Sequence, residues 1–228
     1  MKRYATDTVA NVEEYIKKHG TDGVKELNSL ASAHEIVLEA DGQDKYSSGG
    51  GCDINDGKLR LLFNKSNLGN YTSDASQYID KAVNEASRNG STVSFTARQA
   101  ITKDFDAKIG AVEKKFLAIL QLPDISLEPN WEANFQEVKK KQTGDSWEKE
   151  FGKKTLAYFE ALAEALQNSG FSKDDLLREG WAEAVEKNRI VLKVCDTLKK
   201  MRYNEVWLEG GVAYIQVRPV YLRDPSAS

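Results

Sequence analysis

Apolar residues recur every three or four positions along much of the chain, which is the spacing of helices with one buried face. The clearest case is the stretch from Thr102 to Leu122, which ends just before Pro123. Its apolar residues form one stripe, and mixed Lys, Asp and Glu residues lie on the opposite side of the helix. Further amphipathic helices are expected at about 8–19, 24–31, 74–89, 129–141, 145–168 and 172–185.

Two other stretches alternate apolar and polar residues around a glycine-containing turn, which predicts β-hairpins. The Asp56-Gly57 turn pairs Cys52 with Leu61, and this register puts the apolar residues of both strands on one face. The Gly210-Gly211 turn pairs Trp207 with Tyr214. Isolated short strands are expected at 36–38, 92–96 and 190–194.

The order of these elements predicts the fold class. The helices come in a run between two strand-rich regions, without a regular strand–helix–strand alternation. This order favours an α+β fold with a mainly antiparallel sheet, in which the N-terminal and C-terminal hairpins pack with the amphipathic helices. We expect one domain over 1–228, with a subdivision near 97–104 as the alternative, and a loose tail at 224–228.

Composition narrows the function classes. The chain has 228 residues, with 32 Lys and Arg against 35 Asp and Glu, so its net charge is −3. This charge disfavours nucleic acid as a partner, because salt-driven nucleic-acid binding needs a basic surface. No apolar run approaches the roughly 20 residues of a membrane span. Since no apolar segment follows the basic N-terminal residues, we expect a protein that is cytoplasmic, or secreted without a visible signal peptide.

The sequence gives no strong sign of cofactor or metal chemistry. Cys52 and Cys195 are the only cysteines, and their spacing matches no zinc motif. Two reduced thiols, or one disulfide between them, both fit the sequence. Three Asn-X-Ser/Thr motifs would matter only in a secreted chain. We therefore predict no cofactor and no metal, and a monomer or small homo-oligomer.

The C-terminal hairpin carries the strongest candidate site. One of its faces holds an aromatic pair with hydrogen-bonding neighbours; these residues are Trp207, Tyr214, Glu205, Gln216 and Arg218. The other face is aliphatic and is predicted to lie in the core; it holds Val206, Leu208, Ala213, Ile215 and Val217. Aromatic platforms with polar neighbours suit sugars and protein hot spots. The structural alternative is that a helix covers this face and makes Trp207 a core residue.

We therefore expect a non-catalytic, soluble binding protein whose C-terminal hairpin binds a glycan, a small amphipathic ligand or a protein partner. One alternative is a membrane-active effector or toxin of the pore-forming type. It would hold the amphipathic helix 102–122 in its core in one state and expose it for insertion in another, so a membrane is a possible partner that the chain would not span. A further alternative is a cofactor-free enzyme that uses Cys52 with His34 as its base. The predicted hairpin register points Cys52 toward an apolar face, where a thiol is unreactive.

Overall fold

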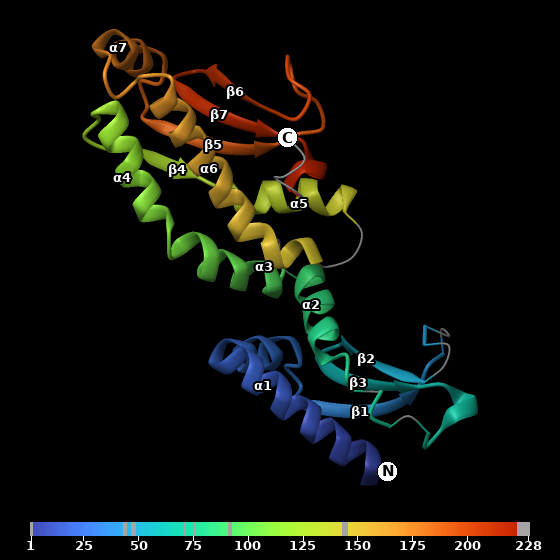
Figure 1. The fold of residues 1–228 in the computed structure, drawn as a ribbon. Coiled ribbons are helices and arrows are strands. Elements are labelled where there is room, and N and C mark those ends of the chain that lie inside the picture. The colour runs from blue at the N-terminus through green and yellow to red at the C-terminus, as the bar shows by residue number, and fades with distance from the viewer. Residues whose placement is uncertain are drawn as a thin grey trace. The chain divides into compact units, whose positions relative to one another are not determined.

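The computed structural model describes residues 2–42, 45, 46, 49–70, 72–74, 76–90, 93–142 and 146–222 (Figure 1). The chain divides into two compact units, residues 1–95 and 96–228, called unit 1 and unit 2 below. The predicted tail at 224–228 lies outside the described residues. That the whole chain behaves as one domain stays a prediction.

The described part of unit 1 holds a three-stranded sheet, two α-helices and a short 3-10 helix at Lys65–Asn67. Its strands are β1 (Glu35–Ala40), β2 (Gly50–Asn55) and β3 (Lys58–Phe63), in the order β1-β3-β2. Helix α1 (Lys2–Leu30) contains a break at Gly20, whose φ of 60° is not helical. The second helix of the unit, α2 (Ile79–Gly90), packs against α1 and β2. Side chains from both helices and the sheet form one apolar core.

The described part of unit 2 holds a four-stranded sheet and several α-helices. The strands are β4 (Ser126–Glu128), β5 (Arg189–Val194), β6 (Asn204–Glu209) and β7 (Val212–Val217), in the order β4-β5-β7-β6. The helices are α4 (Ile109–Leu120), α5 (Trp131–Lys141), α6 (Phe151–Asn168) and α7 (Asp175–Ala184), and α3 (Phe95–Ala100) begins at the boundary between the units. Both α5 and α6 contact β5 (Figure 1).

The α+β class is confirmed, but the mainly antiparallel sheet is wrong. Both sheets are mixed: β1–β3, β4–β5 and β5–β7 run parallel, and only the two hairpins are antiparallel. The turn residues determine the hairpins, because a two-residue turn sets the antiparallel pairing and register of the two strands that it joins. No local signal sets the parallel pairs, because their strands are joined through long connections that place them side by side only in the folded chain.

The helix predicted over 102–122 is interrupted. Residues Ile101–Asp106 form a π-helical turn, and a regular α-helix, α4, resumes only at Ile109. At this turn the backbone of α6 lies close, since a Cβ on Gly152 would come within 2.3 Å of the Ala100 carbonyl oxygen. The apolar stripe itself is buried, as Phe105 and Phe116 show with exposed fractions of 4% and 0%.

The strand expected at 92–96 is also wrong over the described residues. Phe95 begins helix α3 instead. Val93 and Phe95 are both buried, so alternate apolar residues here mark the entry to a helix and not a strand. Thr92 lies outside the described residues.

One buried side chain extends the sheet of unit 2. Strand β4 pairs only with Arg189 to Val191 of β5. Beyond it, the Asn134 side chain of α5 donates to the Leu192 carbonyl at 2.8 Å and accepts from the Val194 amide at 2.7 Å. Asn134 therefore supplies the hydrogen bonds that a longer β4 would have made, and it ties α5 to β5.

Candidate functional site

The predicted register of the C-terminal hairpin is confirmed. Trp207 lies opposite Tyr214, and Glu205 lies opposite Gln216. Gly210 and Gly211 form the turn with φ of 58° and 77°, values that a two-residue turn of this hand requires. Trp207 and Tyr214 are both half-buried.

The neighbouring strands extend the face that holds Trp207 and Tyr214 beyond the hairpin. Val191 of β5 pairs with Tyr214, and Glu128 of β4 pairs with Val191, so the aromatic pair ends a row across four strands. Arg189 binds both carboxylate oxygens of Glu128, with Nε–Oε1 and Nη2–Oε2 distances of 2.5 and 2.6 Å. The hydrogen bond from Arg189 lowers the pKa of Glu128. Sequence reasoning missed this ion pair because it depends on parallel strand pairing.

The carboxylate of Glu205 is hydrogen-bonded to the loop that precedes β6. Its carboxylate accepts the backbone amides of Lys199, Lys200 and Met201 at 2.6, 2.9 and 3.2 Å. The hydrogen bond from the Lys199 amide is the main cause that lowers the pKa of Glu205. Successive amides that converge on one carboxylate form an anion-binding nest, here filled by the protein's own side chain. Glu205 thus fixes the loop, called the 199–201 loop below.

The same loop places a cation over Trp207. The Lys199 ammonium nitrogen lies 3.6 Å from the centre of a Trp207 ring, well within the range of a cation–π contact. The Trp207 indole N–H is buried and has no hydrogen-bond partner within the described part of the chain. Lys199 was not predicted, since no local pattern links it to Trp207.

The two remaining predicted residues lie at the margin of the aromatic pair. Gln216 is buried, with an exposed fraction of 8%. Arg218 follows the end of β7, is half-buried, and donates its backbone amide to the Tyr203 carbonyl at 3.3 Å. The register therefore brings Trp207, Tyr214, Glu205 and Gln216 together, and Arg218 lies just beyond them.

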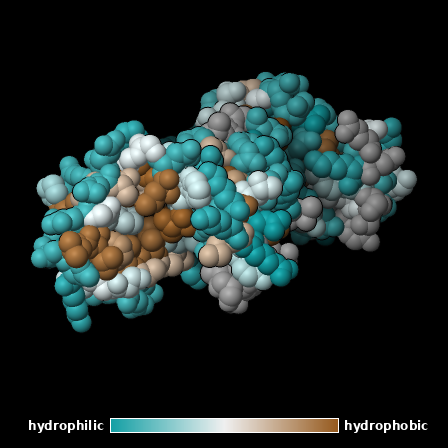
Figure 2. Space-filling view, turned by 90° about the horizontal axis from the view of Figure 1, so that it is seen from above, coloured by the Kyte–Doolittle hydropathy of each residue, from teal (hydrophilic) through white to brown (hydrophobic). Residues whose placement is uncertain are grey.

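The opposite face of the hairpin is only partly core, which corrects the predicted aliphatic face. Ala213, Ile215 and Val217 of β7 are buried. Val206 and Leu208 of β6 are 46% and 43% exposed, because β6 is the edge strand and the helices contact β5. Figure 2 shows that hydrophobic residues gather on one part of the surface seen from above, with hydrophilic residues around them.

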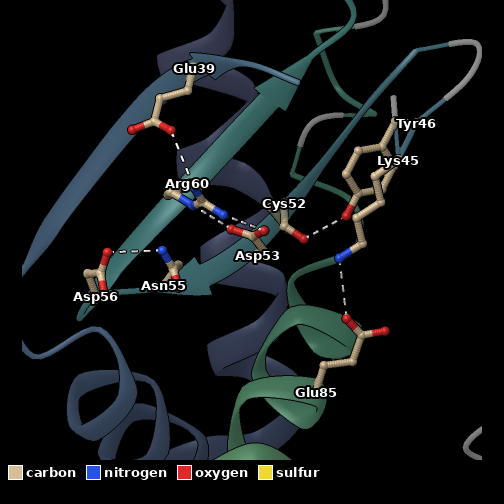
Figure 3. Close-up of polar contacts among 9 residues, drawn as sticks. All are labelled: Glu39, Lys45, Tyr46, Cys52, Asp53, Asn55, Asp56, Arg60 and Glu85. Carbon is tan, nitrogen blue, oxygen red and sulfur yellow. Dashed lines mark hydrogen bonds and ion pairs between the residues drawn. The ribbon is translucent and has the colours of Figure 1, made fainter. Parts of the chain in front are cut away.

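Cys52 lies in a different environment, in the sheet of unit 1. The predicted pairing of Cys52 with Leu61 is confirmed, and its exposed fraction is 2%. Burial raises the pKa of the Cys52 thiol to about 12. Its carbonyl accepts the Tyr46 hydroxyl at 3.0 Å, while the neighbouring Asp53 and Arg60 form a two-point ion pair (Figure 3). A buried neutral thiol is a poor nucleophile.

Both cysteines are free thiols, and Cys195 is half-buried. His34, the base considered for Cys52, is exposed, with a φ of 52° just before β1. Within the described ranges, no group of three or more His, Cys, Asp or Glu residues is placed to hold a metal ion. None of the described helices combines the length and apolar character that crossing a bilayer requires.

Comparison with protein-family models, curated proteins and solved structures finds no match for this chain.

Proposed function

We propose that this chain is a non-catalytic binding protein whose ligand-contact surface is the aromatic pair Trp207 and Tyr214. The observation that carries the proposal is that the two side chains lie opposite each other across β6 and β7 and are both half-buried. Adjacent rings on a sheet offer a flat apolar surface with polar groups at its margin. Such a surface fits a glycan, another small amphipathic ligand, or an apolar side chain of a protein partner.

In this proposal the predicted residues divide into two roles. Trp207, Tyr214 and Arg218 contact the ligand. Glu205 and Gln216 are buried, and the carboxylate of Glu205 already accepts three amides, so these two are positioning residues. They hold the strands and the 199–201 loop in place around the rings.

Lys199 covers the indole in the free protein, and the ligand displaces it. A cation–π contact at an exposed site contributes only about 0.5–1 kcal/mol. Lys199 is exposed, and a lysine side chain has several rotatable bonds. A ligand ring that stacks on Trp207 gains buried apolar area as well as ring contact, which outweighs the loss of the lysine contact.

A glycan array tests the proposal with three forms of the full chain: wild type, Trp207→Ala and Tyr78→Ala. Tyr78 is 43% exposed and lies in unit 1, so its variant controls for the loss of any exposed aromatic ring. We expect wild type and Tyr78→Ala to bind the same glycans and Trp207→Ala to lose them, with all three folded by circular dichroism. A folded Trp207→Ala protein that binds every glycan normally would show that the site is wrong.

If the array is empty, the same three proteins serve in a cross-linking capture experiment. A protein captured by wild type and Tyr78→Ala, but not by Trp207→Ala, would assign the aromatic pair to protein binding. Equal capture by all three forms would show that the aromatic pair is not the binding surface.

A further inference from the structure

A groove lies on unit 1. It runs between the first half of α1 and strand β1, and its volume is about 490 Å³. Its walls include Val9 of α1 and Ile36 of β1, which are 56% and 55% exposed, and Leu61 of β3 also lines it. A groove of this size and apolar character is able to take up side chains of a partner.

Among the described strands, the one beside this groove is an edge strand. Strand β1 is the end strand of the sheet order and pairs with β3 on one side (Figure 1). The Asp41 amide donates to the Phe63 carbonyl of β3 at 2.8 Å. Backbone N–H and C=O groups point to alternate sides along a strand. Since the N–H of Asp41 points toward β3, the N–H and C=O groups of Val37 and the other odd-numbered residues of β1 also point toward β3. The N–H and C=O groups of Ile36 and Leu38 therefore face outward, where none of the described strands pairs with them.

The side chains of Ile36 and Leu38 line the groove, so the free backbone groups and the groove belong to the same two residues. In an added antiparallel strand, the two residues opposite Ile36 and Leu38 would exchange hydrogen bonds with them. Their side chains would point to the same face as those of Ile36 and Leu38. Two apolar side chains of the partner, from residues with one other residue between them, would thus enter the groove.

The other face of β1 selects the charge of the partner. Glu35 and Glu39 lie on this face, with side chains 52% and 48% exposed. Glu35 pairs with Lys58 at 2.5 Å, and Glu39 with Arg60 at 3.5 Å, but Arg60 also serves Asp53 (Figure 3). Three carboxylates therefore share two cations, which leaves the edge acidic.

This charge argues against a second copy of the chain as the occupant. Two β1 strands paired antiparallel about Val37 would place Glu35 of each copy opposite Glu39 of the other. Like charges directly opposite each other destabilise a strand pair. A segment with Lys or Arg at those two positions would instead complement both carboxylates.

We propose that β1 is a docking edge for an extended segment of another protein, which adds as an antiparallel strand. The segment carries apolar residues opposite Ile36 and Leu38 and basic residues opposite Glu35 and Glu39. This site is independent of the aromatic pair proposed above, because it lies in the other unit and uses different residues.

The test uses the full chain and a peptide with a Lys-Val-Thr-Val-Lys core, followed by ¹⁵N NMR titration at low salt. We expect the Ile36 and Leu38 amides to shift on binding and to become protected from exchange. N-methylation of the two valines removes the N–H groups that face β1 and should weaken binding about tenfold or more. N-methylation of the threonine, whose N–H faces away, should change the affinity less than about threefold.

Two protein variants complete the test. Val9→Ser should weaken binding, whereas Ile16→Ser, an exposed α1 residue outside the groove lining, should not. A peptide with Glu in place of both lysines should not bind wild type.

Three outcomes would overturn the proposal. The first is no binding of the basic peptide. The second is equal weakening by both kinds of N-methylation, which would rule out strand addition. The third is uptake of a fatty acid that shifts Val9 and Ile36 without any peptide binding, which would assign the groove to an alkyl chain.

Discussion

The backbone amide of Lys199 donates to Glu205 at 2.6 Å, and the ammonium group of the same lysine lies over the Trp207 ring. Glu205 and Trp207 are two residues apart on β6, so they point to the same face. The hydrogen bonds that fix the 199–201 loop therefore also place the cation that covers the indole. The order of the loop and the cover of the proposed site are coupled.

Replacement of Glu205 by Gln is expected to loosen the 199–201 loop. Gln has one side-chain oxygen and no charge, so it cannot hold three amides as the carboxylate does. The amides of Lys199, Lys200 and Met201 should exchange with solvent several-fold faster, measured by hydrogen–deuterium exchange. Glu209→Gln, at the exposed end of the same strand, is the control and should leave these rates unchanged.

The lowered pKa of Glu205 gives the same contact a pH dependence. A folded-state pKa below the ordinary 4.5 means that the contact stabilises the fold above about pH 4.5 and is lost as the pH falls further. Loop protection in the wild type should therefore drop below pH 4.5. An unchanged exchange rate in Glu205→Gln would contradict the role given to this carboxylate.

The Cys52 thiol is expected to resist alkylation in the native protein. Its pKa of about 12 leaves almost no thiolate at neutral pH, and its exposed fraction is 2%. Iodoacetamide labelling with peptide mapping should modify half-buried Cys195 well before Cys52, and both at similar rates in denaturant. Fast labelling of native Cys52 at pH 7 would contradict this expectation and favour the alternative of a Cys52-dependent enzyme.

The same thiol predicts lower stability at high pH. Below about pH 9 the thiol is neutral in both the folded and the unfolded chain, so it has no effect. Between its ordinary pKa of 9.0 and its folded pKa of about 12, only the unfolded chain ionises, which favours unfolding. The free energy of unfolding in urea should fall over this range, and the fall should be smaller in Cys52→Ala. An equal fall in both proteins would contradict this assignment.

Replacement of Gly152 by Ala is expected to destabilise unit 2. A Cβ there would lie 2.3 Å from the Ala100 oxygen and 2.8 Å from the Ile101 Cα, and backbone atoms cannot turn aside as a side chain can. Such overpacking costs about 1–3 kcal/mol, measurable as a lower urea midpoint. Gly180→Ala in α7, with open space around its Cβ, should instead stabilise the fold by about 0.5–1 kcal/mol. Destabilisation of equal size by both would show that packing against Ala100 is not the cause.

The membrane-active alternative predicts leakage of dye from liposomes, whereas the fold buries the helix stripe that would have to insert. The stripe that would enter a membrane includes Phe105, Val112 and Phe116, all buried in unit 2. Because insertion would have to break this core, we expect no leakage of dye from anionic or neutral liposomes between about pH 5 and 8. Leakage that Phe116→Ser changes, in a protein that stays folded, would favour the membrane-active function.

The hairpins were predictable from the sequence, and the surroundings of the site were not. The Asp56-Gly57 and Gly210-Gly211 turns determine the Cys52–Leu61 and Trp207–Tyr214 pairs through local backbone geometry. The parallel pairing of β5 with β7 joins segments that no turn connects, so alternation alone could not reveal it. The exposure of Val206 has the same origin, because only the complete sheet order makes β6 an edge.

Contacts between a loop and a strand were also beyond local patterns. Lys199 lies eight positions before Trp207, but it precedes strand β6, so no single helix or strand period relates the two residues. The helix over 102–122 is also interrupted next to a tertiary contact, where α6 approaches the 100–101 backbone at Gly152. Sequence periodicity gave the buried stripe correctly, but it could not show the π-helical turn within it.

Isothermal titration of wild type, Trp207→Ala and Lys199→Ala with the ligand found by the array or capture experiment measures whether the Trp207–Tyr214 pair is the binding surface. If the ligand stacks on the indole and displaces the lysine, Trp207→Ala should bind at least about tenfold more weakly. Lys199→Ala should bind as tightly as wild type or up to about fivefold more tightly, because it has no cation to displace. Unchanged affinity in a folded Trp207→Ala protein would contradict the claim that the Trp207–Tyr214 pair is the binding surface.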